Sequence, residues 1–296
     1  MKNNKSVGVL FEQALNKKFE SSISKKYKDN LRQVYNHFME FLGSEAYSTP
    51  LKKLKTSQIE EFLKRYNSSA THYMNKRRDL NVLFNTACKS IDVNLQSVKR
   101  TESRRIKATL NLAYEKEQLK PVLEYLKGSH TNLYRCCLIT YGCLLRSHEE
   151  IRLLTKKHFK ANNTEIHLAG NENKGGRVRV VYVPDYVRQE LDPVLDEIKR
   201  DDNIFSGKLR PFNNSYFTKQ WNRERIKLLS HGVIYPKQTL YSFRHTAAID
   251  IFRRTKDVYM VQKMMGHSSV VVTLKYLRSL GEFNSEELEA AAPKLW

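Results

Sequence analysis

Apolar residues recur every three or four positions through most of the first hundred residues, which is the spacing of one face of an α-helix. Ser57 before one apolar run and Gly43 after another are typical helix start and stop signals. Small, turn-forming residues interrupt the pattern at 44–50 and 67–70. The pattern therefore predicts helices over 11–20, 26–43, 57–67 and 71–89.

The rest of the chain begins with helical patterns at 114–128 and 131–145, and then the period changes. Two short runs rich in β-branched residues, 165–170 and 177–184, flank the Gly/Asn-rich stretch NENKGG, which predicts a β-hairpin. Helical patterns return from residue 187 onward. The predicted fold class is mainly α, with a helical N-terminal domain and a mixed α+β second domain that holds one small antiparallel sheet.

Between residues 99 and 107 the chain is charged and has no apolar period, which is typical of a linker between domains. We expect a helical domain at 1–103, a linker at 104–109, a larger domain at 110–282 and a tail at 283–296. The tail contains a short acidic helix former followed by Pro293. One interpretation of this tail is a helix that folds back on its own domain.

Charge narrows the class of partner. The 296 residues include 52 Lys+Arg against 31 Asp+Glu, a net charge of +21 that is spread over both halves. This excess is larger than solubility requires and favours a polyanion such as nucleic acid. We expect no membrane span, because no long apolar run occurs, and a cytoplasmic, nucleoid-associated protein, because the N-terminus lacks a signal-peptide pattern.

The four cysteines give no sign of a metal site. No CxxC or Cys/His pair has the spacing of metal ligands, and three of the cysteines lie in the apolar stretch LYRCCLITYGCLL. We expect reduced, buried thiols, no metal and no cofactor.

Five residues could together perform chemistry on a nucleic-acid backbone. Arg244, His267 and Tyr276 follow one another within 33 residues, each beside an apolar run. Arginine binds phosphate with two parallel hydrogen bonds, histidine transfers protons and tyrosine can attack phosphorus. Arg146, near a break between helices, could complete a two-arginine clamp on the transition state. Lys174, in the predicted hairpin turn, could protonate the leaving 5′-oxygen.

Four ordered segments resemble the tyrosine recombinase (phage integrase) family, in its Xer-like two-domain form. These segments are GCLLRSHEEIRLL, NKGGRVRVVYVP, YSFRHTAAIDIF and MMGHSSVVVTLKYLR. In the first, Arg146, Glu149 and Leu153 are in phase with the family motif Gly-x-Arg-x-x-Glu-x-x-x-Leu, although Gly142 is more widely spaced. The resemblance covers about 108–280, and residues 1–100 resemble the helical core-binding (SAM-like) domain that usually precedes it.

The resemblance implies cleavage by Tyr276, with a 3′-phosphotyrosine intermediate and a free 5′-hydroxyl, and without ATP or metal. It implies that Arg146 and Arg244 bind the phosphate, that Lys174 is the general acid and that His267 orients or proton-couples at the same phosphate. Glu149 would hold an arginine.

The partners that the resemblance implies are double-stranded DNA with inverted half-sites, a homotetramer on that DNA, and accessory DNA-bending proteins. It also supplies the second interpretation of the tail, 283–296, as a segment exchanged between protomers.

One site position departs from the family pattern. Tyr241 stands where the second arginine motif usually has histidine, three residues before Arg244. A tyrosine hydroxyl can donate a hydrogen bond to phosphate, but a phenol is a poor base at neutral pH. His245 does not simply replace that histidine, because the family often has a second histidine there too. We expect Tyr241→His to keep or raise cleavage activity.

Three other functions remain open on the sequence alone. The departure at Tyr241 leaves room for a catalytically weak, DNA-binding regulator of the same fold. A type IB topoisomerase would share the chemistry, but the Xer-like length and the N-terminal domain argue against it. An RNA-binding protein has the least support, because the aromatic pattern of RNA-binding sheets is absent from the sequence.

Overall fold

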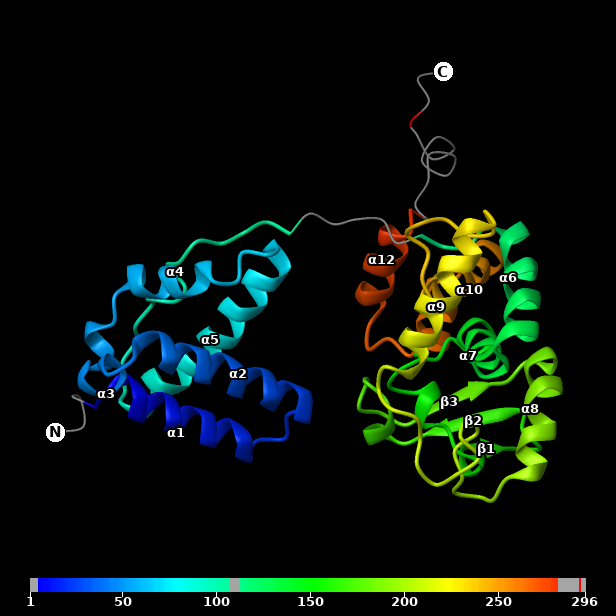
Figure 1. Cartoon of the computed structure of the whole chain (residues 1–296), viewed down its shortest axis with the longest axis horizontal. Helices are drawn as coiled ribbons and strands as arrows, with labels where there is room; N and C mark the ends of the chain where they lie inside the picture. The colour runs from blue at the N-terminus through cyan, green and yellow to red at the C-terminus, as the bar shows by residue number, and fades with distance from the viewer. Residues whose placement is uncertain (1–4, 107–111, 282–292, 294–296) are drawn as a thin grey trace. The chain divides into compact units, whose positions relative to one another are not determined.

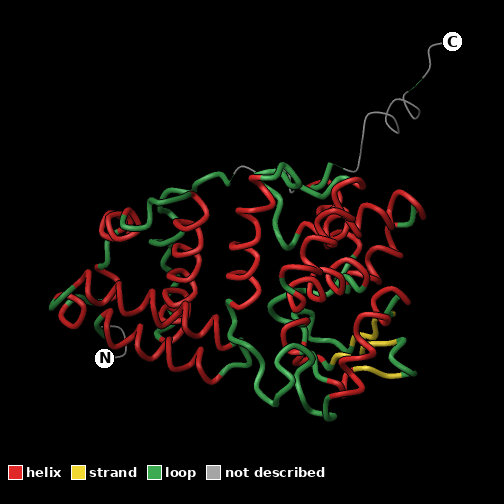
Figure 2. The backbone as a smooth tube through the Cα atoms, turned by 45° about the vertical axis from the view of Figure 1, so that its right-hand side comes forward, coloured by secondary structure: helices red, strands yellow, loops and turns green. Residues whose placement is uncertain are grey.

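The computed structural model describes residues 5–106, 112–281 and 293, and the chain divides into two compact units, Met1–Lys107 and Ala108–Trp296. Both are predominantly helical, and the strands belong to the second unit (Figures 1 and 2). The predicted fold class is confirmed. No described helix is both long enough and apolar enough to cross a membrane.

The N-terminal unit is a helical bundle around an aromatic core. Its elements are α1 (Val7–Glu20), α2 (Lys25–Leu42), α3 (Glu45–Ser48), a 3₁₀ turn (Leu51–Lys53), α4 (Thr56–Lys64) and α5 (Ala70–Ser90). Phe11, Phe38, Phe62 and Phe84 are fully buried, and the rings of Phe38 and Phe62 pack edge to face at 4.9 Å. The predicted stop at Gly43 is confirmed: it ends α2 with φ of +56°, which glycine adopts without strain.

The charged segment at 99–104 packs on this unit, although its sequence alone is typical of a linker. Thr101 is buried, and Arg77 of α5 donates to its side chain at 2.8 Å and to the carbonyl of Lys99 at 2.9 Å. Arg104 stacks over the ring of Tyr73 at 3.9 Å. A charged segment without an apolar period can thus be fixed by arginine contacts.

The second unit has seven α-helices and one sheet among its described residues. The helices are α6 (Lys116–Ser129), α7 (Thr131–Gly142), α8 (Asp185–Glu197), α9 (Tyr216–Ser230), α10 (Ser242–Thr255), α11 (Val258–Met265) and α12 (Val270–Ser279). The strands are β1 (Phe159–Lys160), β2 (Glu165–Leu168) and β3 (Arg179–Tyr182), and 3₁₀ turns occur at Ile151–Leu153, Lys156–His158 and Gly170–Glu172.

The sheet is antiparallel in the order β1-β2-β3, with Ile166 opposite Val181. It lies at one end of the unit beside α8, while α9, α10 and α12 lie toward the other end (Figure 1). The predicted hairpin is confirmed; β1, only two residues long, was not predicted. The loop at 169–178 joins β2 to β3 and carries Lys174.

Helix α10 lies between two apolar clusters. Phe243 belongs to the large cluster built on the sheet and α6–α9, whereas Ala248 and Ile251 belong to a smaller one with α11 and α12. Because α10 packs on both sides, its residues from Ser242 to Ile249 are all buried. The predicted burial of the cysteines is also confirmed, and burial raises the pKa of the Cys143 thiol to about 12.

Candidate active site

Arg244 is buried on α10 with its guanidinium only partly satisfied. Nη2 donates to the carbonyl of Met265 at 2.8 Å, while Nε and Nη1 are buried without a partner among the described residues. Buried polar groups normally have partners, and two free guanidinium donors match an oxyanion of phosphate. Burial lowers the pKa of Arg244, which still leaves it charged at neutral pH.

Arg146 lies in the turn after α7, where Glu150 binds it twice. Its side chain donates to Oε1 of Glu150 at 2.5 Å, and its backbone N–H donates to Oε2 at 2.9 Å. The prediction that Glu149 holds an arginine is wrong, because Glu149 is exposed and Glu150 is 1% exposed.

The reason for this error is a shift of one residue in the motif. The N–H of Glu150 donates to the carbonyl of Arg146, so the turn brings the fourth residue after the arginine inward. Leu153, which is in phase with the family motif, is likewise 39% exposed, and Leu154 beside it is fully buried.

Arg179, on β3, belongs to the same network and was not predicted. Its Nη1 donates to Oε2 of Glu150 at 3.1 Å, and its Nη2 donates to the carbonyls of Met264 at 2.6 Å and Leu144 at 3.1 Å. Burial lowers the pKa of Arg179 to about 10, against the opposing attraction of Glu150. The strand alternation could have revealed it, since Arg179 is in phase with the inward Val181.

Two backbone positions in the left-handed region allow this arrangement. Gly266 has φ of +65° and ends α11; a Cβ there would lie 2.8 Å from Nε of Arg179, so only glycine fits without a shift. Leu144 has φ of +50°, and its carbonyl faces Arg179. Leu144 stands two residues before Arg146, where the family motif has its glycine, so a non-glycine residue adopts the left-handed turn here.

His267 follows Gly266 and is half-buried at the edge of the site. Its Nδ1 is 3.0 Å from the hydroxyl of Thr273, and its ring lies 5.6 Å from that of Tyr276. Burial, and then the charges of Arg244, Arg146 and Arg179, lower its pKa to about 4. His267 is therefore neutral at physiological pH.

Tyr276 extends from α12 toward α10. Its hydroxyl lies 2.6 Å from Nδ1 of His245, and the two ring centroids are 5.4 Å apart. Burial raises the pKa of Tyr276 well above its usual value, and the nearby hydroxyl of Tyr241 raises it further. Tyr241, at the N-terminus of α10, is 36% exposed and packs its ring edge-on against His245 at 4.9 Å.

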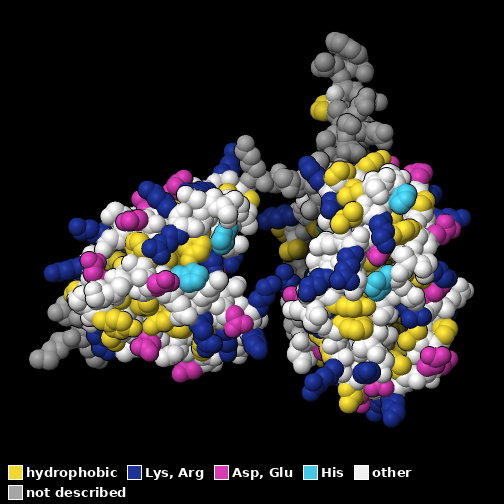
Figure 3. All heavy atoms as spheres, in the orientation of Figure 1, with side chains coloured by type: hydrophobic (Ala, Val, Ile, Leu, Met, Phe, Trp, Pro, Cys, Tyr) yellow, Lys and Arg dark blue, Asp and Glu magenta, His cyan; other side chains and the backbone are white. Residues whose placement is uncertain are grey.

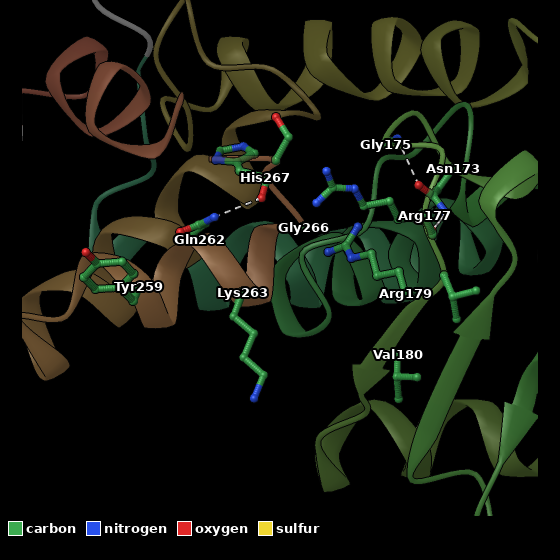
Figure 4. A pocket seen from close by; sticks show the side chains of 12 residues that line it. Asn173, Gly175, Arg177, Arg179, Val180, Tyr259, Gln262, Lys263, Gly266 and His267 are labelled. Carbon is green, nitrogen blue, oxygen red and sulfur yellow. Dashed lines mark hydrogen bonds between the residues drawn. The ribbon is translucent and has the colours of Figure 1, made fainter. Parts of the chain in front are cut away.

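Lys174 lies apart from these residues, exposed in the β2–β3 loop. Among the described residues, it makes no hydrogen bond or ion pair with the other predicted site residues. Its neighbours Asn173 and Gly175 line a hollow of about 540 Å³ together with His267 and Arg179 (Figure 4). The loop therefore approaches the site at the side of His267, and Lys174 stands between two residues of its wall.

Asn173 organises this loop. Its side-chain amide donates to the carbonyls of Ala169 at 2.8 Å and Arg177 at 2.7 Å, and its Oδ1 accepts from the N–H of Gly175 at 2.9 Å (Figure 4). One side chain thus joins the two ends of the loop and fixes the residue after Lys174.

The site as a whole is cationic. Arg146, Arg179 and Arg244 converge with one carboxylate, Glu150, and they come from the turn after α7, from β3 and from α10. The group has an excess of two positive charges and keeps unpartnered donors on Arg244. Such a group can hold a phosphodiester beside the hydroxyl of Tyr276. No cluster of metal-ligating side chains occurs in the described parts of the chain.

Comparison with known proteins agrees with this arrangement. Residues 113–282 match the model of the phage integrase family. The tyrosine recombinase XerA of Pyrococcus furiosus is 25% identical over 206 residues, which cover 66% of this chain and 67% of XerA. The tyrosine recombinase XerC of Rickettsia bellii is 28% identical over 150 residues, 48% of this chain and 45% of XerC, so the aligned part spans less than half of that relative.

A solved structure shares the fold. In a λ integrase tetramer bound to a Holliday junction, one chain matches with a TM-score of 0.73 at 13% identity, covering 93% of this chain and 78% of the other. Residues 113–282 thus form an integrase-type domain, and the chain before them folds into a separate helical unit. The chain belongs to the phage integrase family, and the prediction of a tyrosine recombinase is confirmed.

Proposed function

We propose that this recombinase cuts and rejoins duplex DNA through a 3′-phosphotyrosine on Tyr276. The observation that carries the proposal is the buried guanidinium of Arg244, with two unpartnered donors, in the same site as the hydroxyl of Tyr276. Attack by the Tyr276 oxygen forms an O–P bond and breaks the bond to the 5′-oxygen. Attack by a 5′-hydroxyl reverses the step, so neither ATP nor a metal is consumed.

The predicted site residues take distinct roles in this proposal. Arg146 and Arg244 bind the nonbridging oxygens, where negative charge increases in the transition state. His267, neutral beside three arginines, hydrogen-bonds to the same phosphate. Lys174 protonates the leaving 5′-oxygen when its loop closes on the DNA. Tyr241 contributes a hydrogen bond and packs against His245.

The DNA and the assembly follow from charge and from the relatives. Basic side chains are distributed over the visible face of both units, as a partner that contacts both would require (Figure 3). The related λ integrase is a tetramer on a Holliday junction, and the related XerH binds a palindromic substrate. For this protein we infer a homotetramer on duplex DNA with inverted half-sites, assisted by DNA-bending proteins and acting on cytoplasmic, nucleoid DNA.

The domain limits and the tail remain part of the proposal. We infer a DNA-binding domain at 1–103, a linker at 104–109 and a catalytic domain at 110–282. The tail at 283–296, predicted to be exchanged between protomers, lies outside the described residues except for Pro293.

A covalent-trapping experiment tests the function. The protein is incubated with a pool of duplexes that carry variable inverted half-sites and a nick that prevents rejoining. We expect a protein–DNA adduct with wild type and with the control Tyr182→Phe, which removes an exposed hydroxyl on β3, and no adduct with Tyr276→Phe. An adduct in Tyr276→Phe would refute the nucleophile. Tight binding without an adduct on any duplex would favour a catalytically weak, DNA-binding regulator. Relaxation of supercoiled DNA by the monomeric protein would favour a type IB topoisomerase.

A further inference from the structure

We propose that His245 is the general base for Tyr276, the function for which the family motif provides a histidine at the position of Tyr241. The proposal rests on Tyr276 being the nucleophile. Its basis is direct contact with the reacting atom: Nδ1 of His245 lies 2.6 Å from the Tyr276 hydroxyl, which is within the reach of a general base. The sequence did not indicate this contact, because a histidine after the motif's second arginine is common in the family.

The geometry of α10 explains how the function can move by four residues. Tyr241 and His245 are one helical turn apart, so their side chains share a face of the helix. Their ring centroids are 4.9 Å apart. A basic group on either residue can therefore approach Tyr276 from the same helix face. The residue that bonds to the hydroxyl is the histidine.

The hydrogen-bond pattern fixes the form of the ring that can act. A tyrosine hydroxyl that donates to Nδ1 requires the His245 proton on Nε2 and a free lone pair on Nδ1. His245 is buried, and burial together with the charge of Arg244 lowers its pKa to about 4, so the ring is neutral at physiological pH. The neutral ring can therefore accept this proton at Nδ1 before DNA binds.

The other histidine of the site is less suited to this role. Nδ1 of His267 is already engaged with Thr273 at 3.0 Å, and its ring stands edge-on to that of Tyr276, 5.6 Å away between centroids. Its surroundings include all three arginines of the site, which are the groups that meet phosphate. His267 is placed to donate to phosphate, and His245 is placed to accept from Tyr276.

The step balances without a further reactant. The proton of the Tyr276 hydroxyl passes to Nδ1 of His245 as the tyrosine oxygen forms its bond to phosphorus. The electron pair of the breaking P–O bond leaves on the 5′-oxygen, which takes a proton from Lys174. In rejoining, the attacking 5′-hydroxyl gives its proton back to Lys174, and His245 returns its proton to the departing oxygen of Tyr276.

The charges around His245 make this transfer depend on bound DNA. The groups that face it are Arg244 and Tyr241 on its own helix and Tyr276 on α12, with Arg146 and His267 beyond the tyrosine ring. A bound phosphodiester neutralises the arginine that disfavours the imidazolium, so His245 becomes more basic when substrate is present. Tyr276 consequently keeps its proton until a phosphate is in place.

Single-turnover cleavage of a nicked duplex tests the assignment. We expect His245→Ala and His245→Gln to lower the cleavage rate about 10²- to 10⁴-fold while DNA binding changes little. We expect the double variant Tyr241→His/His245→Ala to cleave at least about tenfold faster than His245→Ala, because it returns an imidazole to the same helix face. Adding Tyr241→His to His267→Ala should give no such gain. Wild type should show an acidic limb in the pH–rate profile that His245→Gln lacks.

The outcomes separate this proposal from the function on which it rests. Wild-type cleavage by His245→Gln, or a double variant no faster than His245→Ala, would overturn the base assignment. Failure of the wild-type protein to form an adduct, or an adduct in Tyr276→Phe, would instead overturn the proposed function. Thermal unfolding shows whether His245→Ala folds, and His245→Gln, which retains a polar side chain, decides the question if it does not.

Discussion

The buried arginine network and the exposed Lys174 loop are built on opposite principles. Arg244 and Arg179 are held in the core, where burial, a carboxylate and backbone carbonyls fix them before any DNA is present. Lys174 is on the surface, and its loop is held by hydrogen bonds of polar side chains. Groups that stabilise charge act best when fixed in advance, whereas a proton donor can be delivered on binding.

The energetic risks of the two regions differ accordingly. In the part of the chain that the structure describes, Glu150 is the single carboxylate that bonds both Arg146 and Arg179, so its loss leaves buried charge without compensation. In the loop, no buried charge among the described residues is paired with Lys174, so a change there should leave the fold intact. Variants in the arginine network should therefore lower both stability and cleavage, whereas variants in the loop should lower cleavage alone.

The largest expected effect is that of Glu150→Ala. Because it leaves Arg179 buried without its carboxylate, we expect the free energy of unfolding to fall by about 3–5 kcal/mol and cleavage to be lost. Chemical denaturation and covalent trapping measure the two effects. The neighbouring Glu149→Ala is the matched control, and since its side chain is exposed, its stability should stay within about 0.5 kcal/mol of wild type. Equal losses in the two variants would contradict the network.

Lys174→Ala should affect the reaction and leave stability unchanged. We expect cleavage to slow about 10²- to 10⁴-fold, because the 5′-oxygen then leaves without a proton. On a substrate with sulfur in place of the bridging 5′-oxygen, the thiolate leaves unprotonated, so the variant should approach the wild-type rate. Lys160→Ala, also exposed, serves as the control. A defect that persists with the sulfur substrate would show that Lys174 is not the acid.

The sequence predicted the fold better than it predicted the connections inside the site. The helices, the hairpin and the order of the site residues follow from periodicity and motif, which are local properties. Glu150, Arg179 and His245 were missed because their roles depend on a turn, on strand phase and on the contact between α10 and α12. The family motif predicted Glu149 from its spacing to Arg146. The backbone after α7 is not helical, however, and it turns the next residue, Glu150, toward the arginines.

A smaller effect is expected for Asn173→Ala, which releases the two ends of the loop without touching the lysine. We expect cleavage to slow about tenfold, because Lys174 then samples more positions, at unchanged stability. The sulfur substrate should remove most of this defect, as for Lys174→Ala, if Asn173 acts through the lysine. Asn171→Ala, in the same loop and exposed, is the matched control and should cleave at the wild-type rate.

The smallest expected effect is a pH dependence of stability that arises from the buried region. His245 and His267 have pKa values lowered to about 4 in the folded protein, against about 6.5 for the unfolded chain. Below pH 6.5 the unfolded state binds protons that the folded state does not, so the free energy of unfolding falls as the pH drops toward 4 and is independent of these groups above pH 7.

Denaturation at a series of pH values for wild type and His245→Gln isolates this contribution, because the other titrating groups are common to both. We expect the difference between the two curves to change by on the order of 1 kcal/mol between pH 7 and pH 5.5. Bound duplex DNA should reduce this change with pH, since its phosphate offsets the charge of Arg244 that opposes protonation of His245. Parallel curves would show that burial and the charge of Arg244 do not hold His245 neutral, and the coupling of its basicity to DNA would lose its basis.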